Sequence, residues 1–123
     1  MSDAQQLFQQ ARTSRVNGDY DQAIALLQQA IEAMPNCAEA HMELGLAYCF
    51  SGLFDESIDE LKHAASLDSI NPEICLHLAK TYTMLGMYEE GAAAFRKVLT
   101  LSSVGDKCYD EASKQLSYFE SMF

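Results

Sequence analysis

The chain has almost no proline or valine and no tryptophan: two prolines, three valines and no tryptophan among 123 residues. Valine favours β-strands, so its scarcity argues against a sheet, while the abundant Ala, Leu, Gln, Glu and Met are good helix formers. Proline and glycine break regular elements, and the sequence holds only two prolines and six glycines. We therefore predict an all-α fold, and the 49% of apolar residues supplies material for its core.

Basic residues are also few. Eight Lys and Arg stand against eighteen Asp and Glu, which gives a formal net charge of −10. Affinity for nucleic acid comes largely from Lys and Arg that neutralise phosphates, so this composition excludes a nucleic-acid partner. It also disfavours an anionic membrane surface and favours a basic or apolar protein partner.

Long apolar runs are missing, so the sequence predicts no membrane insertion. The first residues lack a basic segment followed by an apolar one, so no secretory signal is predicted. The four cysteines show neither a CxxC pair nor a zinc-ligand spacing; they are Cys37, Cys49, Cys75 and Cys108. We interpret them as reduced packing residues of a cytoplasmic protein.

An internal repeat with a period of about 34 residues runs through the chain. Corresponding positions recur at this constant interval in three copies: Gly18, Gly52 and Gly86; Tyr20, Phe54 and Tyr88; Leu27, Leu61 and Phe95. No insertion interrupts this register. A fixed period of this length is the mark of a repeat architecture, in which neighbouring copies stack to bury a shared core.

Each copy has the apolar spacing of two amphipathic helices joined by a tight turn. The expected helices cover 3–16, 20–34, 38–51, 55–68, 72–85 and 89–101, and a closing helix covers about 106–122. Asn71 followed by Pro72 predicts a helix start, and Asp55 is expected to cap another. We predict one domain over residues 1–123, with repeats at about 4–37, 38–71 and 72–105.

This pattern resembles the tetratricopeptide repeat. The family requires small residues where the two helices of a repeat cross, and this sequence has them at Ala11, Gly45 and Ala79 in the first helices and at Ala23, Ser57 and Gly91 in the second. The first copy departs from the family pattern at Gln10 and Ser14. The resemblance implies antiparallel helix pairs stacked in a right-handed superhelix, closed by the last helix.

No set of residues points to catalysis or to a cofactor. The sequence contains none of the glycine-loop, nucleophile or zinc-protease motifs that carry common chemistries. Cys37 and His41 are spaced to share a metal ion, but no third ligand is visible, and His41 is interpreted as a structural residue. We therefore predict that the protein is not an enzyme and that it binds no metal and no cofactor.

The resemblance implies a binding groove lined by the first helix of each repeat. Its predicted lining is Phe8, Arg12, Met42, Glu43, Leu46, Phe50, Leu76, His77, Lys80 and Met84, with Gln5, Gln9, Arg15 and Glu39 on the same face. The apolar members are expected to face solvent and to bind a peptide, although some of them could instead be covered by neighbouring helices.

The site that binds a C-terminal carboxylate in some family members is predicted to be absent from this chain. Members that bind chaperones hold a C-terminal carboxylate with Lys, Arg and Asn side chains. The matching positions here are Phe8, Arg12, Glu43, Glu73 and His77, and only Arg12 suits that task. The leading interpretation is thus an adaptor or chaperone-like module that binds an apolar or amphipathic protein segment; the alternative is a homo-oligomeric scaffold that uses Leu116–Phe123 of a second copy.

Overall fold

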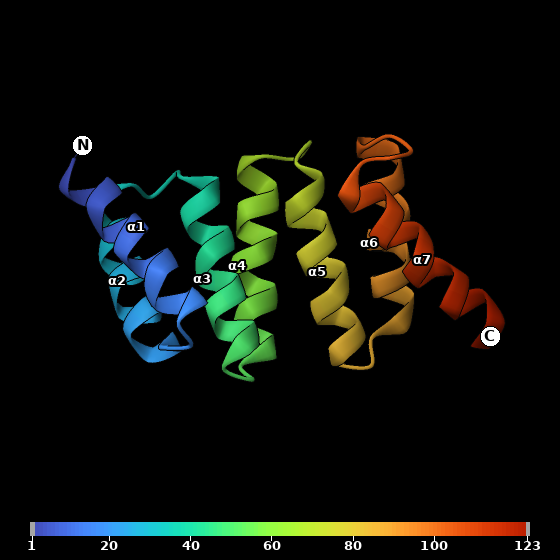
Figure 1. The fold of residues 1–123 in the computed structure, drawn as a ribbon, viewed down its shortest axis with the longest axis horizontal. Helices are drawn as coiled ribbons and strands as arrows, with labels where there is room; N and C mark the ends of the chain where they lie inside the picture. The colour runs from blue at the N-terminus through green and yellow to red at the C-terminus, as the bar shows by residue number, and fades with distance from the viewer. Residues whose placement is uncertain (1, 123) are drawn as a thin grey trace. The chain divides into compact units, whose positions relative to one another are not determined.

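A computed structural model describes residues 2–122, and that range folds into seven α-helices without a strand (Figure 1). They are α1 (Asp3–Val16), α2 (Tyr20–Ala33), α3 (Ala38–Phe50), α4 (Phe54–Leu67), α5 (Pro72–Met84), α6 (Tyr88–Leu101) and α7 (Lys107–Met122). The all-α prediction is confirmed, and the ends of these helices lie within about one residue of those expected from the repeat pattern.

Glycines end the first helix of each pair. Gly18, Gly52 and Gly86 have φ values of 84°, 81° and 76°, a left-handed conformation that other residues rarely adopt. Because these glycines occupy the same position in successive repeats, the chain makes the same turn three times. The second helix of each pair then returns antiparallel to the first.

The two predicted helix starts have different outcomes. The Asn71 side chain accepts hydrogen bonds from the backbone N–H groups of Glu73 (3.0 Å) and Ile74 (3.4 Å), so this cap is confirmed. The cap assigned to Asp55 is wrong, because Leu53 is the N-cap residue of α4 and no side chain caps that helix. Asp55 lies inside the first turn, where its carboxylate complements the helix dipole.

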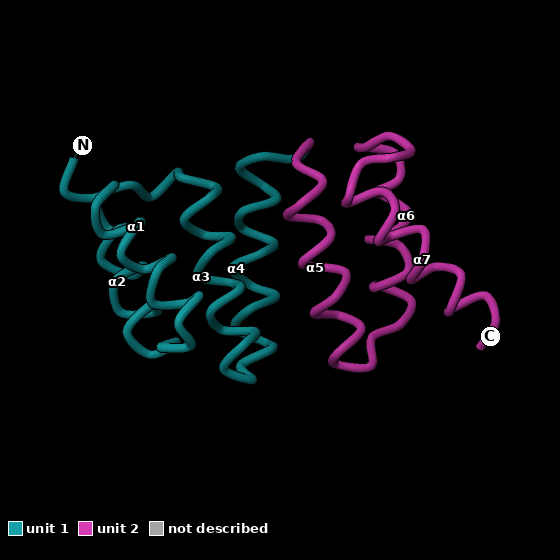
Figure 2. Tube along the Cα trace, in the orientation of Figure 1, with its two compact units in different colours: residues 1–69 teal, residues 70–123 magenta. Residues whose placement is uncertain are grey.

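The helices group into two compact units, residues 1–69 and 70–123 (Figure 2). In unit 1 each helix packs against the next one from α1 to α4, and α1 also touches α3. In unit 2, α6 packs against both α5 and α7, and α5 also touches α7. The single domain expected from the chain length stays a prediction.

Small residues allow the paired helices to cross closely. In unit 1 the Ser57 hydroxyl donates a buried hydrogen bond of 2.7 Å to the carbonyl oxygen of Gly45. A Cβ atom at Gly45 would lie 2.7 Å from Cγ of Leu61. Only glycine fits there, as the small positions of the repeat predict.

The closing helix α7 packs on α6, as expected. Ala112 is fully buried and joins Phe95 and Val98 in the core of unit 2. The Phe119 ring lies against the Phe95 ring, with centroids 5.9 Å apart. Thus α7 covers a face of α6 that would otherwise expose two large apolar side chains.

Candidate peptide-binding surface

In unit 1, the first helices of the repeats leave a small pocket at the surface. It has a volume of about 390 Å³ and is lined by Gln5, Phe8, Gln9, Arg12, Met34, Cys37 and Glu39. Two of the predicted groove residues meet here, because the Arg12 guanidinium lies 5.8 Å from the centroid of the Phe8 ring. An aromatic ring beside a cation can contact both apolar and polar parts of a peptide.

Phe50 is the most exposed of the predicted aromatic contacts. Its side chain is 52% exposed at the end of α3. Its ring stacks on Tyr20, at the start of α2, with centroids 5.7 Å apart and an interplanar angle of 22°. This stack fixes one face of the Phe50 ring and leaves the remainder open to a ligand.

Two other residues of α3 do not face solvent as expected. Met42 and Leu46 are only 5% and 8% exposed. The cause is the position of α3, which contacts α1, α2 and α4, so that every residue from 40 to 47 is buried. A helix surrounded in this way offers little of its middle to a peptide.

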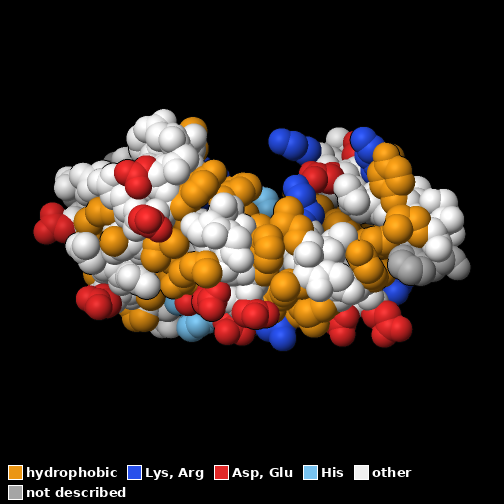
Figure 3. Space-filling view, turned by 90° about the horizontal axis from the view of Figure 1, so that it is seen from below, with side chains coloured by type: hydrophobic (Ala, Val, Ile, Leu, Met, Phe, Trp, Pro, Cys, Tyr) orange, Lys and Arg blue, Asp and Glu red, His pale blue; other side chains and the backbone are white. Residues whose placement is uncertain are grey.

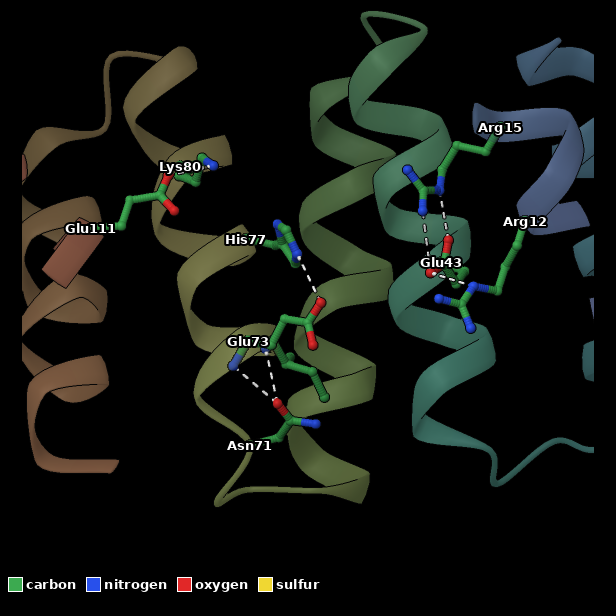
Figure 4. A network of polar contacts seen from close by, with 9 residues as sticks. Arg12, Arg15, Glu43, Asn71, Glu73, His77, Lys80 and Glu111 are labelled. Atoms are coloured by element: carbon green, nitrogen blue, oxygen red, sulfur yellow. Dashed lines mark hydrogen bonds and ion pairs between the residues drawn. The ribbon is translucent and has the colours of Figure 1, made fainter. Parts of the chain in front are cut away.

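Glu43 is also buried, and it is held by two arginines of α1 (Figure 4). Nε of Arg15 donates to Oε2 of Glu43 at 2.6 Å, and Nε of Arg12 lies 3.6 Å from Oε1. The Glu43 side chain is 4% exposed, whereas that of Arg12 is 52% exposed. Glu43 therefore links α1 to α3, and its part in the groove lining stays a prediction.

In unit 2, as in unit 1, some apolar residues of the predicted groove are buried and others are exposed. Leu76 is 4% exposed and belongs to the core with Phe95, so its expected exposure is wrong; α5 is covered there by both α6 and α7. Met84, near the other end of α5, is 59% exposed. In α3 and α5 the described surface thus offers the helix ends more than the middles.

Two polar pairs complete the surface of unit 2 (Figure 4). Nζ of Lys80 lies 2.7 Å from Oε1 of Glu111, and Nε2 of His77 lies 3.7 Å from Oε1 of Glu73. Both basic side chains therefore have a carboxylate beside them. The Lys80 pair is a partly exposed ion pair, which stabilises the fold little but fixes where positive charge is presented.

His41 has the environment of a structural residue. Its Nδ1 lies 2.7 Å from a carboxylate oxygen of Glu60, and its Nε2 lies 2.8 Å from the carbonyl oxygen of Pro35. The ring also stacks on His63, with centroids 4.1 Å apart. Both ring nitrogens are engaged, and no group of three or more potential metal ligands occurs among residues 2–122.

The four cysteines form no disulfide bond in the structure. Burial raises the pKa of the Cys75 thiol. Burial also raises the pKa of Cys108, and the nearby carboxylates of Glu73, Glu111 and Asp106 raise it further. A raised pKa disfavours the thiolate, which is the nucleophilic form, so these two residues act as packing groups.

No helix within residues 2–122 is long and apolar enough to cross a membrane.

Family models agree with the repeat seen in the structure. Two tetratricopeptide repeat models match the chain, one over residues 8–72 and the other over residues 72–104. The chain belongs to the tetratricopeptide repeat family. Its members fold as stacked helix pairs, and the seven helices described in residues 2–122 follow that plan.

Among known proteins, the chain is 30% identical over 105 residues to a DnaJ homolog subfamily C member 3 from Gallus gallus. That match covers 85% of this chain but only 21% of the relative, so the chain spans about a fifth of that protein's length. The other segments of the relative have no counterpart in this comparison.

Two solved structures show the same fold at low identity. The type III secretion translocator chaperone SycD from Yersinia enterocolitica is 18% identical, with a TM-score of 0.91 over 96% of this chain and 83% of that one. The first tetratricopeptide repeat domain of Spaghetti (RPAP3), bound to the HSP90 peptide SRMEEVD, is 18% identical. Its TM-score is 0.88 over 97% of this chain and 91% of that one.

Two features of the surface were not predicted. The first is the role of Arg15, whose partner Glu43 stands in the buried and mostly apolar run 40–47. A carboxylate in such a run needs a buried cation, and that need is the signal that could have found the pair. The second is a large pocket beside α7, which no residue pattern marks.

Proposed function

We propose that the protein is a protein–protein interaction module, an adaptor or chaperone-like protein, that binds an apolar or amphipathic peptide segment on the first helices of its repeats. The observation that carries this proposal is the surface of unit 1. There the pocket beside Phe8 and Arg12 lies on α1, and the exposed Phe50 ring ends α3. Exposed aromatic side chains held by a rigid scaffold are typical anchors of peptide ligands.

The charges favour a ligand other than an acidic C-terminus. The HSP90 peptide in the Spaghetti complex contains three acidic residues. In this chain Arg12 already pairs with Glu43, and Glu73 stands at another of the matching positions. With a net charge of −10, the chain would repel such a peptide and attract one with basic or apolar residues.

Similarity to a DnaJ homolog and to a secretion translocator chaperone supports the chaperone-like variant of this proposal. The absence of any catalytic constellation from the sequence fits a protein that acts by binding alone. The scaffold alternative needs Leu116–Phe123 to enter a second copy, and Phe123 lies outside the described residues. It has weaker support, because Leu116 and Phe119 already pack on the core of their own unit.

The test is a selection from a displayed library of short peptides on the purified protein. We expect the selected peptides to be apolar or amphipathic with basic flanks, and we expect Phe50→Glu to weaken their binding by at least ~2 kcal/mol, roughly thirtyfold. Val104→Glu is the matched control, because Val104 is an exposed apolar residue (80%) between α6 and α7, away from the first helices of the repeats. Equal binding by the two variants, both shown to be folded by circular dichroism, would place the peptide site elsewhere.

A further inference from the structure

A pocket lies between α6 and α7, within unit 2. Its volume is about 1120 Å³, and its lining is Gly86, Met87, Tyr88, Glu89, Glu90, Ala92, Arg96, Leu116, Phe119 and Glu120. The Tyr88 ring meets the edge of the Phe119 ring, with centroids 6.0 Å apart, and Tyr88 remains 42% exposed. The pocket is thus built mainly of apolar groups, and it shares no residue with the proposed peptide surface.

The repeat register explains why this side of α7 is open. Ser113 of α7 occupies the position that Gly45 has in α3, two repeat periods earlier in the chain. In unit 1, Gly45 is the point at which α4 crosses α3, and a side chain there would strike Leu61 of α4. On α7 the equivalent Ser113 is exposed, and α7 packs only against α6 and α5 within residues 2–122.

This open side runs into the pocket. Ser113, Leu116 and Glu120 are spaced i, i+3 and i+7, so they follow one face of α7. Leu116 and Glu120 line the pocket, and the exposed Ser113 lies about one turn before Leu116 on the same face. Over residues 113–120, the face of α7 that corresponds to the α4-covered face of α3 is therefore a strip beside an apolar pocket. A helix is the element whose shape matches such a strip.

The charges at the rim indicate which kind of helix would fit. Three carboxylates border the pocket, from Glu89, Glu90 and Glu120, against the single guanidinium of Arg96. Glu89 and Glu90 are exposed, so their charges face an incoming ligand. On the face of the molecule drawn in the space-filling view, hydrophobic side chains lie at the surface with acidic and basic ones between them (Figure 3). A ligand with basic residues beside its apolar stripe is complementary to this rim.

A second copy of the chain matches the rim poorly. The helix that covers α3 in unit 1 is α4, and it carries Asp55, Glu56, Asp59 and Glu60 but only one lysine. Two copies would also bring together two net charges of −10. Like charges at an interface oppose association, so the occupant should be a different, basic chain.

We propose that the α6–α7 pocket is a second docking site, which binds an amphipathic helix of a partner protein with lysine or arginine beside its apolar stripe. The bound helix takes the place on α7 that α4 takes on α3. Tyr88, Leu116 and Phe119 contact its apolar stripe, and Glu89, Glu90 and Glu120 contact its basic flank. This site is independent of the peptide surface on the first helices.

The experiment uses two helix-stabilised synthetic peptides as probes. One has the sequence of residues 54–67, and the other has the four acidic residues of that segment replaced by lysine. Fluorescence polarisation with the whole chain should show the lysine peptide binding at least ~tenfold tighter than the acidic one. Phe119→Glu should remove most of this binding, and Phe50→Glu should leave it unchanged, which separates this site from the proposed peptide surface.

Charge reversal is the sharper variant, because it acts on exposed positions outside the core. Glu89→Lys with Glu90→Lys should reverse the preference, so that the acidic peptide binds better than the lysine peptide. The control is Asp21→Lys with Glu32→Lys, which changes the net charge equally at exposed positions of α2 in unit 1. That control should keep the original preference within about twofold, apart from general screening effects.

Three results would overturn the proposal. The first is no binding of either peptide to the folded wild-type chain. The second is an equal loss of lysine-peptide binding in the two double variants, which would show attraction to net charge alone. The third is a wild-type dimer in sedimentation that Phe119→Glu converts to a monomer, because the occupant would then be a second copy.

Discussion

Helices α3 and α7 occupy equivalent places two repeats apart, yet one is buried and the other is half exposed. On α3 all residues from 40 to 47 are buried, whereas Ala112 is the buried residue of α7 among those described. The difference follows from the neighbours: α4 covers α3, and no described helix covers the same side of α7. Position in a repeat thus sets which way a side chain points, while the next helix decides whether it is buried.

One ion pair occurs twice and shows this difference directly. Arg12 with Glu43 and Lys80 with Glu111 are equivalent pairs, because both members are displaced by two repeat periods. The Glu43 side chain is 4% exposed and has a second partner in Arg15, while the Glu111 side chain is 30% exposed. The same contact is part of the packing in unit 1 and a surface feature in unit 2.

The largest contrast is expected at Leu46 and its equivalent, Lys114. Leu46→Glu should lower the free energy of unfolding by at least ~3 kcal/mol, because it places a carboxylate where Leu46 is 8% exposed. Lys114→Glu changes charge at an exposed position and should shift stability by less than about 0.5 kcal/mol. Urea unfolding followed by circular dichroism measures both. A Leu46→Glu variant as stable as the wild type would restore Leu46 to the peptide surface.

A smaller contrast separates Gly45 from Ser113. Gly45→Leu should cost about 2–3 kcal/mol, because its Cβ atom alone would come within 2.7 Å of Leu61. Ser113→Leu lies on the open side of α7 and should change stability by no more than about 0.5 kcal/mol. Thermal unfolding of the two variants tests the register. Similar losses at both positions would mean that α7 is covered in solution, and the proposed docking site would then be occupied.

The smallest contrast concerns the repeated ion pair. Arg15→Ala removes the 2.6 Å contact to the buried Glu43 and leaves only Arg12, at 3.6 Å, so we expect a loss of about 2 kcal/mol. Lys80→Ala breaks a pair whose side chains are 38% and 30% exposed, so it should cost less than about 1 kcal/mol. Chemical denaturation at low and high salt checks the difference. Only the Lys80 effect should shrink markedly in salt.

Most of the fold could be predicted because the same turn and helix-crossing residues recur in three repeats. Gly18, Gly52 and Gly86 mark the turns, and the small positions mark the helix crossings. The cap at Asp55 could not be judged in this way, because a carboxylate in a first turn and one at an N-cap look alike in sequence. The helix bounds depend on repeated patterns, whereas a single cap depends on one local geometry.

The candidate surface was predicted less well, and Met42, Leu46 and Leu76 show why. They were assigned to a solvent-facing groove because the family register places them on the first helices, but all three are buried. Phe50 and Met84, which have the same apolar character and lie at helix ends, are exposed. The periodicity of the sequence predicts which face of a helix a residue occupies, but it does not predict how closely the next helix approaches that face.

The sequence by itself determined the helices, their turns and the repeat, because these depend on contacts between residues close in the chain or related by a fixed period. Only the tertiary structure decided that Glu43 meets Arg15, that the middle of α3 is covered, and that one side of α7 opens into a pocket. These features depend on the distances between helices, which packing sets for all neighbours together.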